Sequence, residues 1–178
     1  MNNLIKLIGD FIMRFIEKRS VEVLADTNEE QDNFPRQFHS SIREVRFYGC
    51  NLLCKIIGFS IMTGMKINIK EIDKYYRVFI AGKFIDKNCF VSYLGLDGIY
   101  TYLSTVYNTR MIRQATGIKY KKGLTIAPGV YLAKCKNGSE THFRIYDQNM
   151  NIIYEPWFKT DEKFKPAKLY KLDYKEEA

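Results

Sequence analysis

Three residues of this 178-residue chain have the types and the order needed for thiol chemistry. Cys50 stands at the expected start of an apolar helix, His142 lies in an expected strand, and Glu155 ends the next strand. A thiol becomes a good nucleophile when an imidazole takes its proton and a third group orients the imidazole ring. The order predicts a Cys50–His142–Glu155 site, with Asp147 and Asn151 as alternative orienting groups.

The position of Cys50 separates it from the other cysteines, each of which lies in an apolar stretch typical of core packing: Cys54, Cys89 and Cys135. Backbone N–H groups at a helix start favour the thiolate and lower the pKa of a thiol there. Gly49, directly before Cys50, lets a substrate backbone approach closely. We therefore expect Cys50 to be the reactive cysteine.

The cysteine pattern also bears on redox compartment and metal binding. A chain with a core of this size needs no disulfide framework, so four cysteines fit a reducing, cytoplasmic setting. Cys50 and Cys54 are one helical turn apart, a poor spacing for a structural zinc knuckle. We expect no metal site, the alternative being a zinc site of three cysteines and His142.

The elements that must position these residues are helices first and strands afterwards. Residues 50–62 are apolar on nearly every side, which predicts a central buried helix. Asn68 and Glu71 form the pattern of a capping box for a second helix, and Asp97 is the expected cap of a third. The predicted strands are residues 130–135, 140–146, 151–154 and 167–174, with Asn137-Gly138 as a hairpin turn. This order predicts an α+β domain.

Alternation along the strand at 140–146 gives its side chains two faces. Phe143 and Ile145 point to one face, whereas His142, Arg144 and Tyr146 point to the other. His142 is therefore expected off the apolar face, where it can meet a cleft.

The N-terminal part differs from the rest of the chain. Residues 1–25 carry an apolar stripe at helical spacing interrupted by charges, which predicts an amphipathic helix that neither spans a membrane nor serves as a signal peptide. Residues 26–41 are acidic and turn-rich, which predicts a linker. The main domain is then 42–178, and the N-terminal helix is a candidate oligomer or partner contact.

The sequence resembles the papain-like cysteine peptidase superfamily over roughly residues 36–174. The resemblance rests on Tyr48-Gly49-Cys50-Asn51-Leu52-Leu53, His142-Phe143 and Tyr154-Glu155-Pro156-Trp157. It is greatest to the branch that holds bacteriocin-processing peptidases and small phage- or plasmid-encoded bacterial relatives of unknown function. It implies a central helix carrying the cysteine, packed on a C-terminal antiparallel meander.

The resemblance also implies roles for individual residues. Cys50 would be the nucleophile, His142 the general base and Glu155 the orienting acid, with no metal or cofactor; a substrate would contact residues near the site: Tyr48, Gly49, Tyr146 and Trp157. Two positions depart from the family pattern. Glu155 replaces the usual Asp, and Glu44 stands where an oxyanion-hole glutamine is expected, although a carboxylate repels an oxyanion. Gln37, further back, is the alternative donor.

Two functions follow from these residues. The first is a peptidase or related amide or thioester hydrolase acting on a peptide or peptidoglycan-like substrate. The alternative is a catalytically degenerate papain-like module that binds a peptide or protein partner through its aromatic side chains. The net charge of +8 permits an anion-binding patch around Lys119 and Lys122. The sequence has no recognisable nucleic-acid-binding motif, and this absence argues against nucleic acid as the partner.

Overall fold

The computed structural model describes residues 34–157 and 161–175. The predicted N-terminal helix, 1–25, and the first half of the predicted linker, 26–33, lie outside these residues. Residues 35–37 lie against the end of strand β5 (Ile152–Tyr154), because the Gln37 N–H donates to Pro156 O at 2.9 Å and the Tyr154 hydroxyl donates to Pro35 O at 2.7 Å.

Four α-helices are present among the described residues, after the short 3-10 helix η1 (Gln37–His39). They are α2 (Arg43–Tyr48), α3 (Cys50–Thr63), α4 (Ile69–Ala81) and α5 (Gly95–Val106). Helix α3 is the central one, since its residues from Leu52 to Ser60 are all buried. It ends at Gly64, which adopts the left-handed conformation with φ of 74°.

The helix ends test three of the predictions. The capping box before α4 is confirmed, because the Asn68 side chain accepts from the Glu71 N–H and the Glu71 carboxylate accepts from the Asn68 N–H. The start of α3 at Cys50 is confirmed as well. The prediction that Asp97 caps the third helix is wrong: α5 begins at Gly95 with Leu94 as its N-cap, so Asp97 lies inside the first turn.

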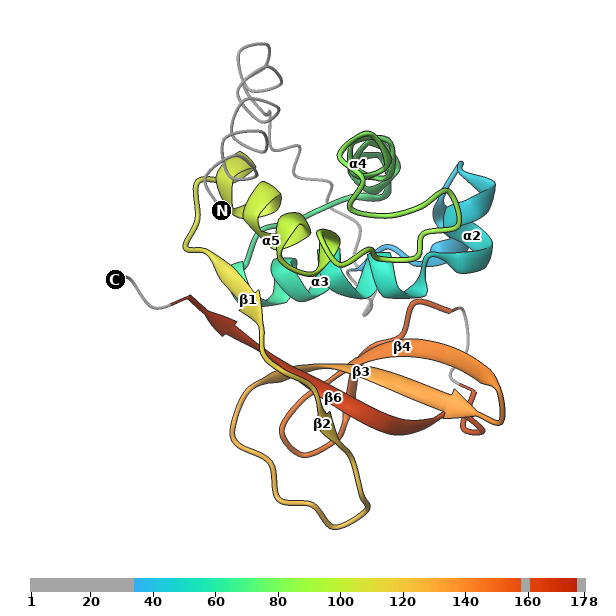
Figure 1. The fold of residues 1–178 in the computed structure, drawn as a ribbon, viewed down its shortest axis with the longest axis vertical. Coiled ribbons are helices and arrows are strands. Elements are labelled where there is room, and N and C mark those ends of the chain that lie inside the picture. The colour runs from blue at the N-terminus through green and yellow to red at the C-terminus, as the bar shows by residue number, and fades with distance from the viewer. Residues whose placement is uncertain (1–33, 158–160, 176–178) are drawn as a thin grey trace. The chain divides into compact units, whose positions relative to one another are not determined.

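The strands form one antiparallel sheet beneath the helices (Figure 1). Its long members are β3 (Val130–Asn137), β4 (Glu140–Tyr146) and β6 (Lys165–Tyr174), and the spatial order is β1-β6-β3-β4-β5. The short strands β1 (Ile112–Gln114) and β2 (Ile118–Lys119) both pair with β6. Helices on one face of an antiparallel sheet confirm the α+β prediction.

The two faces of the sheet have different neighbours. A Cβ on Gly58 of α3 would meet Leu172 and Ile145, so the face holding these side chains packs against the helices. The opposite face holds a second apolar cluster of Tyr131, Ala133, Cys135, Tyr146, Phe164 and Leu169. Among the residues that the structure describes, no helix is both long and apolar enough to cross a membrane.

Candidate functional site

His142 and Glu155 meet directly. His142 is fully buried on β4, and its Nε2 lies 2.6 Å from Oε1 of Glu155, which directly follows β5. Trp157 packs over the imidazole with ring centroids 3.9 Å apart. Because an ionised carboxylate only accepts hydrogen bonds, Nε2 is the donor in this contact, and Nδ1 is the ring nitrogen that the contact leaves free.

Glu155 keeps its charge through a set of donors. Nε of Arg144 donates to Oε2 at 2.5 Å, and the Trp157 N–H donates to Oε1 at 3.1 Å. Burial acts to raise the pKa of Glu155, but the hydrogen bond and charge of His142, the Trp157 N–H and the Arg144 charge outweigh it, so the pKa is lowered. Glu155 is therefore a carboxylate at neutral pH.

Arg144 is the part of the site that the sequence analysis missed. It is 1% exposed, and its two terminal nitrogens donate to Phe164 O at 3.0 Å and Asp161 O at 2.7 Å. An arginine two positions from His142, and therefore on the same side of the strand, is a signal for such a partner, since fully buried arginines are nearly always paired. The predicted alternatives Asp147 and Asn151 bond instead to each other across the β4–β5 turn.

Cys50 is half-buried at the first position of α3, with Gly49 as the N-cap. Burial raises the pKa of its thiol to about 11, although hydrogen bonds from the main chain at Phe143, Asn51 and Cys50 itself act to lower it. The expectation that the helix start gives a lowered pKa is therefore wrong for the resting structure. Loss of hydration outweighs the backbone donors.

The structure brings Cys50 beside the strand that carries His142 without joining the two side chains. The Cys50 sulfur meets the main chain of Phe143, the residue after His142, and lies near enough to Glu155 for the carboxylate to raise the pKa of the thiol. Nδ1 of His142 is buried and has no hydrogen-bond partner among the described residues. Catalytic hydrogen bonds are often formed only when substrate is present.

Gln37 folds in toward the start of α3. It is 2% exposed, and its Nε2 donates to Val45 O at 3.1 Å and to Arg46 O at 3.2 Å. Val45 O also accepts the Gly49 N–H at 2.9 Å, so the amide lies at the junction between α2 and α3. Both protons of the amide are thus occupied, and an oxyanion would have to displace a carbonyl to use them.

Glu44 lies elsewhere. It is in the first turn of α2, and its charge acts to raise the pKa values of Cys89 and Tyr76. Glu155, rather than Glu44, is the carboxylate that affects the Cys50 thiol. The acidic residue at the expected glutamine position is therefore not one of the charges that shift the pKa of the Cys50 thiol.

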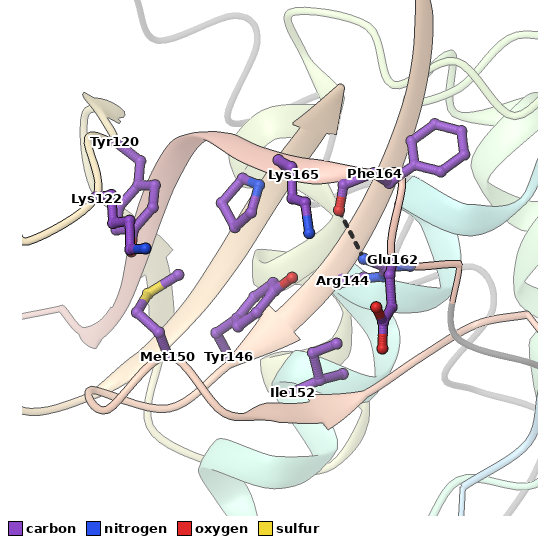
Figure 2. Close-up of a pocket in the computed structure, with 10 residues that line it drawn as sticks. Tyr120, Lys122, Arg144, Tyr146, Met150, Ile152, Glu162, Phe164 and Lys165 are labelled. Atoms are coloured by element: carbon purple, nitrogen blue, oxygen red, sulfur yellow. Dashed lines mark hydrogen bonds between the residues drawn. The ribbon is translucent and has the colours of Figure 1, made fainter. Parts of the chain in front are cut away.

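The predicted substrate-contact residues lie in three places. Tyr48 is 53% exposed at the end of α2, next to Gly49, where a Cβ would come within 2.4 Å of Val45 O. Trp157 covers His142. Tyr146 lines a cavity of about 700 Å³ on the sheet face away from the helices, with Arg144 beside it (Figure 2).

A comparison with protein families gives a match over nearly the same residues that the structure describes. Residues 33–175 match the model described as "Protein of unknown function, DUF261". The chain belongs to the DUF261 family. No curated protein and no solved structure matches it.

In this member of DUF261, the site residues do not form a metal centre. Within residues 34–157 and 161–175, no group of three or more histidine, cysteine, aspartate or glutamate side chains is placed to hold a metal ion. All four cysteines are free thiols, and His142 is engaged by Glu155. What the arrangement offers is a thiol, an unpartnered basic nitrogen and a fixed carboxylate.

Proposed function

We propose that the chain is a papain-like thiol hydrolase that cleaves an amide or thioester bond of a peptide or peptidoglycan-like substrate in a reducing, cytoplasmic setting. The observation that carries this proposal is the imidazole of His142. Its Nε2 is held by Glu155 at 2.6 Å, while Nδ1 is buried and unpartnered on the strand whose main chain meets the Cys50 sulfur. A buried polar atom without a partner requires an explanation, and a general base provides one.

The reaction begins from a protonated thiol, because the raised pKa of Cys50 keeps it protonated near pH 7. Nδ1 of His142 takes the thiol proton as the sulfur forms a bond to the acyl carbon. The imidazolium then gives this proton to the leaving amine or thiolate as the acyl bond breaks. Water adds to the resulting thioester and restores the free thiol.

Glu155 and Arg144 position the base. The carboxylate fixes the tautomer that leaves Nδ1 free, and it stabilises the imidazolium that forms during the attack. Arg144 holds the second carboxylate oxygen at 2.5 Å, so Glu155 cannot turn away from His142. The main-chain N–H groups at the start of α3 supply the donors available for a developing oxyanion.

A second candidate function is a binding module without chemistry. Two observations favour it: His142 is fully buried, and the 700 Å³ cavity lined by Tyr146 lies on the sheet face away from the helices. In that case the His142–Glu155–Arg144 network only fixes the sheet behind a ligand cavity.

The experiment that separates the two is acylation of the full chain by p-nitrophenyl acetate at pH 7, followed by mass spectrometry of each cysteine peptide. Cys50 should be acetylated faster than the buried Cys54. His142→Gln should slow this by about 100-fold or more, because glutamine can still donate to Glu155 but cannot take a proton.

His39→Ala is the matched control, since His39 is the other histidine, is exposed, and its ring accepts a hydrogen bond from the Arg36 N–H. Its acylation rate should equal that of the wild type. Equal acetylation of Cys50 in wild type and His142→Gln would reject the hydrolase and leave the binding module.

A further inference from the structure

The strand register places lysines side by side across the sheet. Lys168 of β6 is the direct cross-strand neighbour of Lys119 on β2 and of Lys134 on β3. Lys134 is in turn the neighbour of Phe143 on β4. Directly paired residues of an antiparallel sheet point to the same side, so Lys119, Lys168 and Lys134 form one row, here called the lysine row.

The lysine row faces the helices and ends near Cys50. Phe143 shares its face with Ile145, which packs under Gly58 of α3. The main chain of Phe143 meets the Cys50 sulfur. Neighbouring strands are about 4.8 Å apart, so the row leads across roughly three strand spacings to the first turn of α3.

The charges of the row are not neutralised within the described part of the chain. Lys119 and Lys168 are exposed and Lys134 is half-exposed, and none of the three makes an ion pair there. Like charges placed directly opposite each other destabilise a sheet. The arrangement therefore lowers stability in the free protein and becomes favourable when an anion lies over it.

Lys168 is also held in place. Its Nζ lies 5.2 Å from the centre of the Tyr170 ring, and a Cβ at Gly117 would come within 2.4 Å of its Cε. The stem is thus packed between two neighbours while the ammonium stays at the surface. A packed stem reduces the entropy lost on binding.

We propose that the lysine row is the subsite for an acidic stretch of the polypeptide that Cys50 cleaves. The inference rests on the proposed hydrolase and names its substrate class. An extended peptide advances about 3.3 Å per residue, so roughly four residues of peptide cover the two strand spacings, about 10 Å, between Lys119 and Lys134. A polypeptide is favoured over nucleic acid because thiol acyl transfer needs a carbonyl carbon, which a nucleic-acid backbone lacks.

The test is fluorescence anisotropy of a labelled peptide of about ten alternating glutamate and alanine residues, at low salt, where charge interactions are least screened. The full chain carries Cys50→Ala so that no turnover occurs. The row variant adds Lys119→Gln, Lys134→Gln and Lys168→Gln. The control variant instead adds three exposed lysine changes around α4: Lys66→Gln, Lys70→Gln and Lys74→Gln.

Both triple variants remove three charges from a net charge of +8, so they differ only in where the charge is lost. The row variant should bind the peptide at least about tenfold more weakly, and the control variant should change little, because a local field rather than net charge holds the ligand. The row variant should unfold at the same temperature as the parent or a higher one, since it relieves repulsion.

Equal weakening in both triple variants would overturn the proposal, because net charge alone would then explain binding. A single-stranded oligonucleotide that displaces the peptide, binds more tightly and depends on the same three lysines would also overturn it in favour of nucleic acid. Binding is measured on the Cys50→Ala chain, so a failure of the peptide to bind rejects the lysine row as a subsite. An unreactive Cys50 in the acylation experiment rejects the hydrolase instead.

Discussion

Glu155 and Lys55 are both buried ionisable groups, but the surroundings of Glu155 stabilise its charged form and those of Lys55 do not. Glu155 is 6% exposed and has Arg144, His142 and the Trp157 N–H around its two oxygens. Lys55 of α3 is 1% exposed, and its hydrogen bonds to described residues go to neutral oxygens, Gln114 Oε1 at 2.7 Å and Leu96 O at 3.3 Å.

The pKa values follow from this difference. Burial lowers the pKa of Lys55 to about 7, and the exposed Asp97 opposes this only in part. Glu155 has a lowered pKa despite burial, because charged and main-chain donors together exceed the cost of lost hydration. A buried group therefore keeps its charge where oppositely charged partners surround it, and titrates near neutrality where only dipoles do.

The largest expected effect comes from removing a partner of the charged network. Arg144→Met should lower the free energy of unfolding by about 3–5 kcal/mol, because it leaves the Glu155 charge buried with one fewer partner. It also removes the donors to Phe164 O and Asp161 O. Urea unfolding followed by circular dichroism measures the change.

The matched control for Arg144→Met is Lys171→Met. Lys171 makes an ion pair with Asp173 at 2.9 Å, but both side chains are about one-third exposed. Exposed pairs contribute about 0–1 kcal/mol, so this variant should stay close to the wild type. Similar losses in the two variants would show that Arg144 does not support a buried charge.

Lys55 should give the second largest effect, visible as a dependence of stability on pH. Its folded pKa of about 7 is below the ordinary value of 10.5, so between these values the unfolded chain binds more protons and stability rises with pH. From pH 7 to pH 9 the gain should be on the order of 2 kcal/mol. Lys55→Met should remove this rise in urea unfolding.

Lys66→Met, at an exposed lysine after α3, should keep the rise. The range stops at pH 9 because burial raises the pKa of Cys50 from 9.0 to about 11, which lowers stability at higher pH as the unfolded thiol ionises. If stability still rises from pH 7 to pH 9 in Lys55→Met, the rise belongs to another titrating group.

The sequence predicted the parts of the fold that depend on local patterns. The start of α3 at Cys50 and the Asn68 capping box follow from residues within a few positions of one another. The prediction that His142 lies off the apolar face is wrong, because His142 is fully buried and its ring contacts Phe164 of the second apolar cluster. Strands β1 and β2 were missed because they have three and two residues, too few for alternation to be visible.

Of the predicted site, the structure joins one pair, His142 and Glu155, at 2.6 Å. It does not join the side chains of Cys50 and His142, since His142 Nδ1 has no hydrogen-bond partner among the described residues. The raised pKa of Cys50 could not be predicted, because it depends on burial by chain segments far away in sequence. The role of Arg144 and the partners of Gln37 could not be predicted for the same reason, since both are fixed only by the tertiary fold.

The smallest expected effect concerns Glu155 in acid. Its folded pKa is lowered from the ordinary value of 4.5, so its contribution to stability is present above that value and is lost as the pH falls through the folded pKa. The effect is small because burial, the largest influence on this pKa, opposes the partners. Glu155→Gln should therefore make the free energy of unfolding decline less steeply below about pH 5, whatever the variant does to stability at neutral pH. The control is Glu162→Gln, at an exposed carboxylate, which should leave the decline unchanged. Urea unfolding at several acidic pH values measures the slope. An unchanged slope in Glu155→Gln would mean that the partners of Glu155 do not stabilise its charged form. The contrast between Glu155 and Lys55 would then fail.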